Sequence, residues 1–359
     1  MNDYEVIVKE EQQRVNDALA KYLDSKIEQV SRLGDWHTKY YANIREYIMR
    51  GGKRLRPILV AIGYKAIRED VDIQHLYRAA CSVEILHNGS LLHDDLIDHD
   101  ETRRGGKTFH ATYRDWYKTH SENMEKAQDF GMTMAILGGD SLLNMGAESI
   151  SQSHLAPEIE VKCQNLYQTA FQYLADGVML EMTMMNQKDT SPETYLEMVA
   201  MKTAVLFEKS LLMGANLASA TESQLNALQE YGIKVGQAFQ MQDDILGTFG
   251  DEEVTGKPAD GDIREGKKTM LVIVSYKNAN EEQQNLLDNL LGKDGMSDEE
   301  VEQVRQLFRD TGALKETEDL MMDLLRKGQN ALEAAVPPLI ERYKNFLLNL
   351  SQFLVERKY

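Results

Sequence analysis

Apolar residues recur at helical spacing along this chain, and that pattern constrains its fold more than any other sequence feature. The segment Ser297-Asp298-Glu299-Glu300 has the pattern of a helix capping box, and Gly312 follows as a stop signal. Apolar residues lie between them at helical spacing: Val301, Val304, Leu307 and Phe308. Ser191-Pro192-Glu193 marks a second helix start. The short apolar run Met270 to Ser275 is interpreted as helix, and no hairpin signal is found, so the sequence predicts an all-α fold.

The composition favours one domain over residues 1–359. The chain has only six prolines and no Gly/Ser-rich or Pro-rich linker, so no segment resembles a hinge between separately folded parts. No apolar run approaches the roughly 18 residues that would suggest a membrane span. The N-terminal residues Met1 to Glu5 lack the basic-then-apolar order of a signal peptide. We therefore expect a cytoplasmic protein without stable membrane insertion.

The charge distribution favours a small anionic ligand. A net charge of −18 argues against nucleic acid as a partner, because a phosphate backbone must be neutralised by Lys and Arg. The basic residues are concentrated instead in three groups: Arg50 to Arg56, Arg103 to Lys107 and Lys257 to Lys268. The two cysteines, Cys81 and Cys163, lie in apolar helix-like contexts and predict buried thiols, not a disulfide framework or a thiolate metal site.

Two acidic clusters stand about half the chain apart. The first contains Asp94, Asp95 and Asp98, and the second contains Asp243 and Asp244. On a helix, Asp94 and Asp98 share one face, where carboxylate oxygens could hold a hard divalent cation. Because Mg²⁺ is usually completed by substrate phosphate, acidic clusters followed by Lys and Arg predict a diphosphate held between magnesium ions and cationic side chains.

These segments resemble the motifs of the trans-isoprenyl diphosphate synthases, also called polyprenyl synthetases. In the first half the similar segments are Gly51 to Pro57, Asp94 to Asp98 and Arg103-Arg104-Gly105. In the second half they are Lys202-Thr203, Phe239 to Asp244, Gly256 to Asp262 and Lys267-Lys268-Thr269. We place the motif-bearing core at about residues 45–275.

The resemblance implies a single-domain all-α helical bundle with a deep central cavity, of the isoprenoid synthase type, forming a homodimer. It also implies a prenyltransferase that condenses an allylic diphosphate with isopentenyl diphosphate in trans. The reaction proceeds by magnesium-assisted ionisation, condensation and proton elimination. Such chemistry needs positive charge around the diphosphate and low polarity along the hydrocarbon.

The resemblance also assigns roles to single residues. Several Mg²⁺ ions per site would be bound by five aspartates: Asp94, Asp95, Asp98, Asp243 and Asp244. Contacts to the allylic diphosphate would come from Arg103, Lys202, Lys257 and Lys267. Lys202, Thr203 and Gln240 would be the catalytic residues, and the oxygen dipoles of Thr203 and Gln240 would stabilise the nascent cation. The isopentenyl diphosphate pocket would comprise Lys53, Arg56, His87 and Arg104.

The chain departs from the family pattern at two positions. Gly247 replaces the last aspartate of the second cluster, which leaves Asp251 as a distant supplement. Val178 stands where the family often has glutamine after Gly177, and Glu181 is the candidate for the acidic role that follows.

Small residues before the first acidic cluster predict a long product. Gly89 and Ser90 lie five and four positions before Asp94, roughly one helical turn along the path of a growing chain. Large aromatic residues close this pocket in short-product relatives, so we expect geranylgeranyl diphosphate, with a longer all-trans-polyprenyl diphosphate as the alternative. Gly89 and Ser90 could instead serve only close helix packing.

Three other protein classes share some of these sequence features. A terpene cyclase would not need the isopentenyl diphosphate residues Lys53, Arg56 and His87. A non-catalytic subunit of a heteromeric synthase would be expected to lose Asp or Arg residues from the motifs. A di-iron bundle could use the Glu84 to His87 segment, but it needs a second Glu-x-x-His, which the chain lacks.

Overall fold

The computed structural model describes residues 3–69, 73–185, 187, 189–250 and 260–355. Helices make up most of this part of the chain, so the all-α prediction is confirmed. The chain forms two compact units: unit 1 contains Met1–Gln168 and Ser210–Ala220, and unit 2 contains Thr169–Lys209 and Thr221–Tyr359. The single domain over residues 1–359 stays a prediction.

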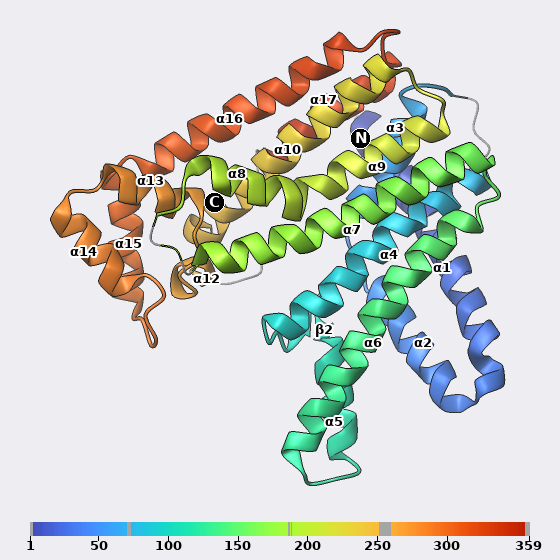
Figure 1. Ribbon diagram of the computed structural model, residues 1–359, viewed down its shortest axis with the longest axis horizontal. Coiled ribbons are helices and arrows are strands. Elements are labelled where there is room, and N and C mark those ends of the chain that lie inside the picture. The colour runs from blue at the N-terminus through green and yellow to red at the C-terminus, as the bar shows by residue number, and fades with distance from the viewer. Residues whose placement is uncertain (1–2, 70–72, 186, 188, 251–259, 356–359) are drawn as a thin grey trace. The chain divides into compact units, whose positions relative to one another are not determined.

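Unit 1 is built around two long helices that lie side by side, α4 and α6 (Figure 1). Its elements are α1 (Asp3–Val30), η1 (Ser31–Leu33), α2 (Asp35–Met49), α3 (Leu55–Lys65), α4 (Ile73–Ile97), β1 (Thr102–Arg103), β2 (Gly106–Lys107), α5 (Phe109–Lys118), α6 (Met124–Ser151), the first part of α7 (Pro157–Met185) and the end of α9 (Val205–Leu217). Helices α1 and α3 pack on α4, and α5 packs on α6. The core of unit 1 is therefore shared by helices that come from its whole length.

Glycines allow the close approach of α4 and α6. A β-carbon added at Gly89 would lie 3.1 Å from the Leu142 β-carbon and 3.3 Å from the Gly139 carbonyl oxygen. One added at Gly139 would overlap the imidazole of His93. Larger side chains at these positions would push the helices apart, so the packing role considered for Gly89 has a structural basis.

A two-stranded antiparallel hairpin follows α4, so the expectation of no hairpin is wrong. Thr102 pairs with Lys107 and Arg103 with Gly106. Arg104 and Gly105 form the turn with φ values of 51° and 74°, the positive pair that a tight two-residue hairpin turn requires. The strands are too short to show alternation of apolar and polar residues, and the paired glycines were the only signal.

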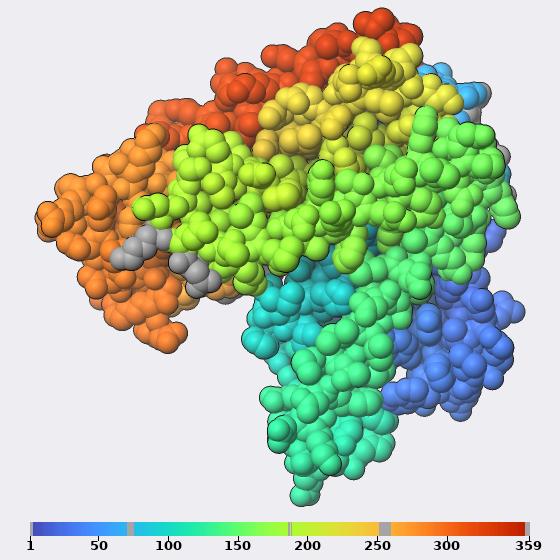
Figure 2. Space-filling model, in the orientation of Figure 1, coloured from blue at the N-terminus to red at the C-terminus, as the bar shows by residue number. Residues whose placement is uncertain are grey.

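Unit 2 is organised around α10, which packs against α16 and α17 (Figure 1). Its elements are the end of α7, α8 (Pro192–Val199), the π-helix η2 (Ala200–Ala204), the start of α9 (Val205–Leu217), α10 (Glu222–Phe249), α12 (Gly261–Arg264), α13 (Met270–Asn278), α14 (Glu281–Leu290), α15 (Asp298–Asp310), α16 (Ala313–Ala331), η3 (Leu332–Ala334) and α17 (Glu341–Val355). Helices α14 and α15 pack together and form one continuous orange surface in Figure 2.

The local helix signals are confirmed. Ser191 caps α8 by accepting a hydrogen bond from the Thr194 backbone N–H, and Ser297 forms a capping box with Glu300 at the start of α15. Gly312 has a φ of 75° just after α15 ends, as a helix stop requires. The run Met270 to Ser275 lies within α13.

Both cysteines are buried free thiols, as predicted. Burial raises the pKa of Cys81 and of Cys163 to about 12, so both remain protonated at neutral pH. Across the described residues, no helix is both long and apolar enough to cross a membrane.

Candidate functional site

The glycine-rich loop before α3 is held in shape by a buried arginine. Arg54, only 3% exposed, has a φ of 52° and is the residue before the first turn of α3. Its guanidinium donates to the Glu84 carboxylate at 2.6 Å and to the Ile48 carbonyl at 2.7 Å. This charge therefore serves the fold, and it fixes the segment that carries the predicted ligand residues Lys53 and Arg56.

The hairpin turn lies against the same loop. The Arg104 guanidinium donates to the Gly51 carbonyl at 2.8 Å, and a β-carbon at Gly52 would lie 3.3 Å from the Arg104 Cζ atom. Only glycine at position 52 gives Arg104 this room without displacing it. The structure thus brings Arg104 next to the loop that carries Lys53, as the resemblance implied.

His87 faces a concentration of guanidinium groups within unit 1. Burial lowers its pKa well below the usual value, and the positive charges of Arg56, Arg104 and Arg103 lower it further. The imidazole is therefore neutral near pH 7 and can donate one hydrogen bond, not two, to a ligand. We name Lys53, Arg56, His87, Arg103 and Arg104 the basic site of unit 1.

The first acidic cluster occupies the last turn of α4 and the residue that follows it, Asp98. Asp94 and Asp98 are one turn apart, and the Asp98 N–H donates to the Asp94 carbonyl at 2.8 Å, so their side chains share a face. Asp95 is fully buried and accepts hydrogen bonds from the Tyr47 hydroxyl at 2.7 Å and from Arg103 Nε. Asp95 therefore orients Arg103, whereas its predicted part in magnesium binding stays a prediction.

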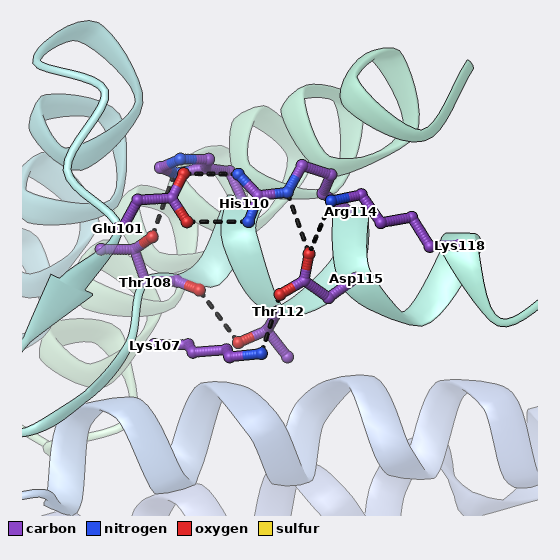
Figure 3. A network of polar contacts seen from close by, with 8 residues as sticks. All are labelled: Glu101, Lys107, Thr108, His110, Thr112, Arg114, Asp115 and Lys118. Carbon is purple, nitrogen blue, oxygen red and sulfur yellow. Dashed lines mark hydrogen bonds and ion pairs between the residues drawn. The ribbon is translucent and has the colours of Figure 1, made fainter. Parts of the chain in front are cut away.

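An ion-pair network anchors the hairpin to α5 (Figure 3). Both terminal nitrogens of Arg114 pair with the Glu101 carboxylate, and Arg114 Nε donates to Asp115 at 3.0 Å. Asp115 also accepts from Lys107 of β2 at 2.8 Å. Hydrogen bonds from Lys107 and Arg114 hold the pKa of Asp115 well below its usual range. The network fixes both ends of the hairpin that carries Arg103 and Arg104, and no sequence motif indicated it.

In unit 2 a chain of hydrogen bonds joins the predicted catalytic residues. The Thr203 hydroxyl donates to Gln240 Oε1 at 2.8 Å, and Gln240 Nε2 donates to Asp244 Oδ1 at 2.8 Å. The buried Tyr195 hydroxyl donates to the other oxygen of Asp244. Each partner fixes the orientation of the next, so Thr203, Gln240 and Asp244 form one arranged cluster.

Lys202 and Thr203 lie in a π-helix, a local irregularity that is often found at functional sites. Lys202 Nζ forms an ion pair with Glu181 of α7. A β-carbon at Gly177 would stand 2.5 Å from the Lys202 backbone nitrogen, so glycine is needed for α7 to pass this segment. Glu181 therefore contacts Lys202, the lysine that the resemblance assigns to the allylic diphosphate. The acidic role considered for Glu181 from the sequence stays a prediction.

These side chains line a pocket within unit 2, together with methionines. The wall includes Glu181, Lys202, Thr203, Gln240, Asp244, Lys267 and the apolar residues Met184, Met185 and Met198. Burial raises the pKa of Asp244 to about 7, and the negative charge of Asp262 adds to the shift. Burial would lower the pKa of Lys267, but nearby carboxylates outweigh it and raise that pKa, so the ammonium is charged. We name the polar part of this wall, with Asp243, the acidic site of unit 2.

Asp262 is a further carboxylate of this site, and the sequence motifs gave it no role of its own. It lies in α12, its Oδ1 atom is 3.3 Å from Lys267 Nζ, and its Oδ2 atom occupies the space that a side chain at position 247 would enter. The sequence feature that could have identified Asp262 is its position at the end of Gly256 to Asp262, a segment that resembles a family motif. Lys257 and Asp251, two residues given roles from the sequence, lie outside the described residues.

The described residues contain no group of three or more His, Cys, Asp or Glu side chains close enough to hold a metal ion together. The two acidic clusters nevertheless present the oxygen donors that magnesium prefers. Asp94 and Asp98 supply one set, and Asp243 and Asp244 the other. The donor chemistry therefore fits magnesium.

Comparisons with known proteins identify the family. The model of the polyprenyl synthetase family matches residues 38–308. The geranylgeranyl diphosphate synthase of Saccharolobus solfataricus is 34% identical over 313 residues, which cover 86% of this chain and 87% of that protein. The corresponding synthase of Geoglobus acetivorans is 32% identical over 94% of this chain and 97% of its own length.

A solved structure agrees with these relatives. The geranylgeranyl pyrophosphate synthase of Corynebacterium glutamicum, complexed with isoprenyl diphosphate and magnesium, superposes with a TM-score of 0.87 and 29% identity. The match covers 96% of this chain and 98% of that one. Family model, sequence relatives and fold thus agree with one another, and the chain belongs to the polyprenyl synthetase family of isoprenyl diphosphate synthases.

Proposed function

We propose that this prenyltransferase adds isopentenyl diphosphate to an allylic diphosphate in trans and makes geranylgeranyl diphosphate. The hydrogen-bonded cluster of Thr203, Gln240 and Asp244 beside Lys202 and Lys267 carries the proposal. It combines fixed oxygen dipoles, lysine charges and a carboxylate in one pocket, which is what ionisation of an allylic diphosphate needs. Relatives named geranylgeranyl diphosphate synthases support the product.

The carboxylates of Asp94, Asp98, Asp243 and Asp244 are proposed to hold several Mg²⁺ ions, with Asp95 in support. Bound magnesium would neutralise the diphosphate leaving group and so favour its departure. Lys202, Lys267, Arg103 and Lys257 would add positive charge to the same diphosphate. Asp95 accepts a hydrogen bond from Arg103, so Asp95 supports diphosphate binding by positioning that arginine.

The carbocation left by ionisation needs partial negative charge nearby without a nucleophile that would trap it. The Thr203 hydroxyl is tied up as a donor to Gln240, so the lone pairs of its oxygen can point elsewhere. Met184 and Met198 line the same pocket with buried, polarizable side chains that carry no charge and lower the polarity beside the cation.

Isopentenyl diphosphate is proposed to bind at four residues of the basic site of unit 1, namely Lys53, Arg56, His87 and Arg104, while Arg103 faces the allylic diphosphate. Neutral His87 would donate a single hydrogen bond, and the guanidiniums of Arg56 and Arg104 would supply paired donors to phosphate oxygens. Lys53, which is exposed, would add point charge. After the new carbon–carbon bond forms, the released diphosphate is the proposed acceptor of the eliminated proton.

We further propose a homodimer. Helix α6 exposes Met132, Ile136 and Leu137 at 43%, 42% and 52% of their surface. An exposed apolar group of this kind on one helix is typical of a protein interface. Light scattering of the eluting peak in size-exclusion chromatography tests this state, and a monomer at micromolar concentration would contradict it.

The direct test supplies the purified chain with Mg²⁺, isopentenyl diphosphate and one primer: dimethylallyl, geranyl or farnesyl diphosphate. Products are dephosphorylated and sized by chromatography. A ceiling at twenty carbons supports the proposal, whereas a longer ladder identifies the long-chain alternative. Absence of elongation from every primer contradicts it, and cyclic products would then indicate a terpene cyclase.

A matched pair of variants ties the activity to the acidic clusters. Asp94→Asn removes a proposed magnesium ligand without changing side-chain size, and we expect a loss of at least about a hundredfold in kcat/KM. Asp294→Asn, in the exposed turn after α14, is the control and should retain full activity.

A further inference from the structure

Unit 1 contains a second cavity that none of the synthase motifs enters. It is formed by α1, the start of α4 and the segment 152–154 that follows α6, and its volume is about 480 Å³. That size is within the roughly 300–1,000 Å³ of small-molecule sites. Its basic and acidic lining residues are Arg14, Asp17, Lys21, His75, Arg78 and His154, and Tyr77 also lines it. We name it the α1–α4 cavity.

The α1–α4 cavity carries excess positive charge on a protein whose net charge is −18. Three permanent cations, Arg14, Lys21 and Arg78, face one carboxylate, Asp17. Lys21 has no ion-pair partner in the part of the chain that the structure describes. The cavity is therefore an isolated positive region that a ligand of the opposite charge would neutralise.

A neighbouring carboxylate does not cancel this charge. Arg14 Nη1 lies 3.3 Å from Glu11, but Glu11 is buried and also pairs with the ammonium of Lys65. One negative charge is thus shared between two cations. The excess at the α1–α4 cavity remains positive after this pair is counted.

Arg78 is held rigidly at the cavity. Its guanidinium stacks over the Tyr22 ring, with Cζ 4.5 Å from the ring centroid, and Nη2 donates to the side-chain oxygen of Gln152. Its Nε atom is buried and has no hydrogen-bond partner within the described residues. Both contacts are to uncharged groups, so they fix the guanidinium without neutralising it. The charge of Glu148 also acts on Arg78, but that carboxylate is already paired with the ammonium of Lys26.

Two histidines complete the lining. His75 Nδ1 donates to the Ser153 carbonyl, and the next residue, His154, has a φ of 54°, which is rare for a residue with a side chain. The His75 and His154 rings meet edge to face with centroids 6.2 Å apart. A backbone in this conformation, kept at the edge of a positive cavity, is the kind of local strain that accompanies binding sites.

We propose that the α1–α4 cavity binds a small molecule that carries two or more phosphate groups. Fixed guanidiniums suit bidentate contact with phosphate oxygens, and Lys21 adds a mobile point charge. A ligand with several negative charges can neutralise the three cations, whereas a ligand with one carboxylate group cannot. This site is separate from the proposed substrate sites and does not depend on the proposed function.

Hydrogen exchange with mass spectrometry tests the proposal, because it reports where a ligand binds. The full-length protein is exchanged with and without tripolyphosphate, in EDTA so that magnesium-dependent binding is suppressed. Wild type is compared with Lys21→Gln, an exposed substitution that leaves the fold intact, and with Lys9→Gln, an exposed lysine of the same helix outside the cavity. Inorganic diphosphate is the second probe.

We expect saturable protection of peptides that cover residues 14–21, 75–81 and 150–156 in wild type and in Lys9→Gln. In Lys21→Gln the half-saturating concentration should rise at least about fivefold. Protection confined to peptides of the substrate sites would overturn the proposal. So would protection at the cavity that Lys21→Gln leaves unchanged.

Discussion

A β-carbon placed on Gly247 would stand 2.7 Å from Oδ2 of Asp262. The last position of the second acidic cluster is therefore already faced by a carboxylate, which comes from α12 and also contacts Lys267 at 3.3 Å. Although Gly247 replaces the family aspartate, the carboxylate of Asp262 lies where the side chain at position 247 would be. The sequence suggested the more distant Asp251 as the supplement, and that residue lies outside the described part of the chain.

Restoring the family aspartate should therefore harm this enzyme. Gly247→Asp would bring two carboxylates together, and we expect kcat to fall at least about tenfold because Asp262 must move and like charges repel. The double variant Gly247→Asp/Asp262→Gly relieves the crowding and should recover part of the loss. Steady-state assays at saturating magnesium compare them, and a fully active single variant would refute the assigned role of Asp262.

The Arg54–Glu84 pair predicts an unequal response to losing one partner or both. Both side chains are at most 3% exposed, so Arg54→Met leaves a buried carboxylate uncompensated and should lower the free energy of unfolding by about 3–5 kcal/mol. Arg54→Met/Glu84→Leu should cost less than the single variant. Arg45→Met, which breaks the exposed pair with Asp24, should cost about 0–1 kcal/mol. Urea denaturation measures all three, and equal losses for Arg54→Met and Arg45→Met would contradict the assignment.

The hairpin network predicts a change in substrate affinity without loss of the fold. Arg114→Ala removes the contacts to Glu101 and Asp115, so the hairpin that carries Arg103 and Arg104 should loosen. We expect the KM for isopentenyl diphosphate to rise about tenfold, with a smaller change in kcat. Lys118→Ala, which removes a contact to the same Asp115 at 3.3 Å, is the control. An unchanged KM in Arg114→Ala would show that the network does not position the hairpin.

The sequence predicted the helices correctly and proposed the candidate site residues for one physical reason: both rest on local spacing. The caps at Ser191 and Ser297 act within three residues, and Asp94 and Asp98 share a face because of helical periodicity. The hairpin was missed because two-residue strands show no alternation. Local spacing also could not show that Asp95 points to Tyr47, or that Asp262 lies beside Gly247, because tertiary packing decides both.

Product length is the next property that one substitution can test. Ser90 is 5% exposed and its hydroxyl donates to the His87 carbonyl at 2.9 Å, so the side chain is inside unit 1. If the growing chain passes this position, Ser90→Phe should shorten the main product below twenty carbons, with Ser90→Ala as the size-matched control. An unchanged product distribution in a folded, active Ser90→Phe variant would assign Ser90 to helix packing alone.

The hydrogen bond from Tyr195 to Asp244 predicts a specific effect on magnesium. Tyr195→Phe keeps the ring but removes the donor that orients one carboxylate oxygen, while Gln240 still holds the other. Because partners of this kind fix the geometry of metal ligands, we expect the magnesium concentration at half-maximal rate to rise about 10–100-fold. Tyr276→Phe removes a hydroxyl that donates to Asp288 at 2.8 Å on the surface of unit 2, and it should leave the magnesium dependence unchanged. If both variants need the same magnesium concentration as wild type, the orientation of Asp244 does not affect magnesium binding. If both variants need more magnesium to the same extent, the effect comes from a general loss of stability.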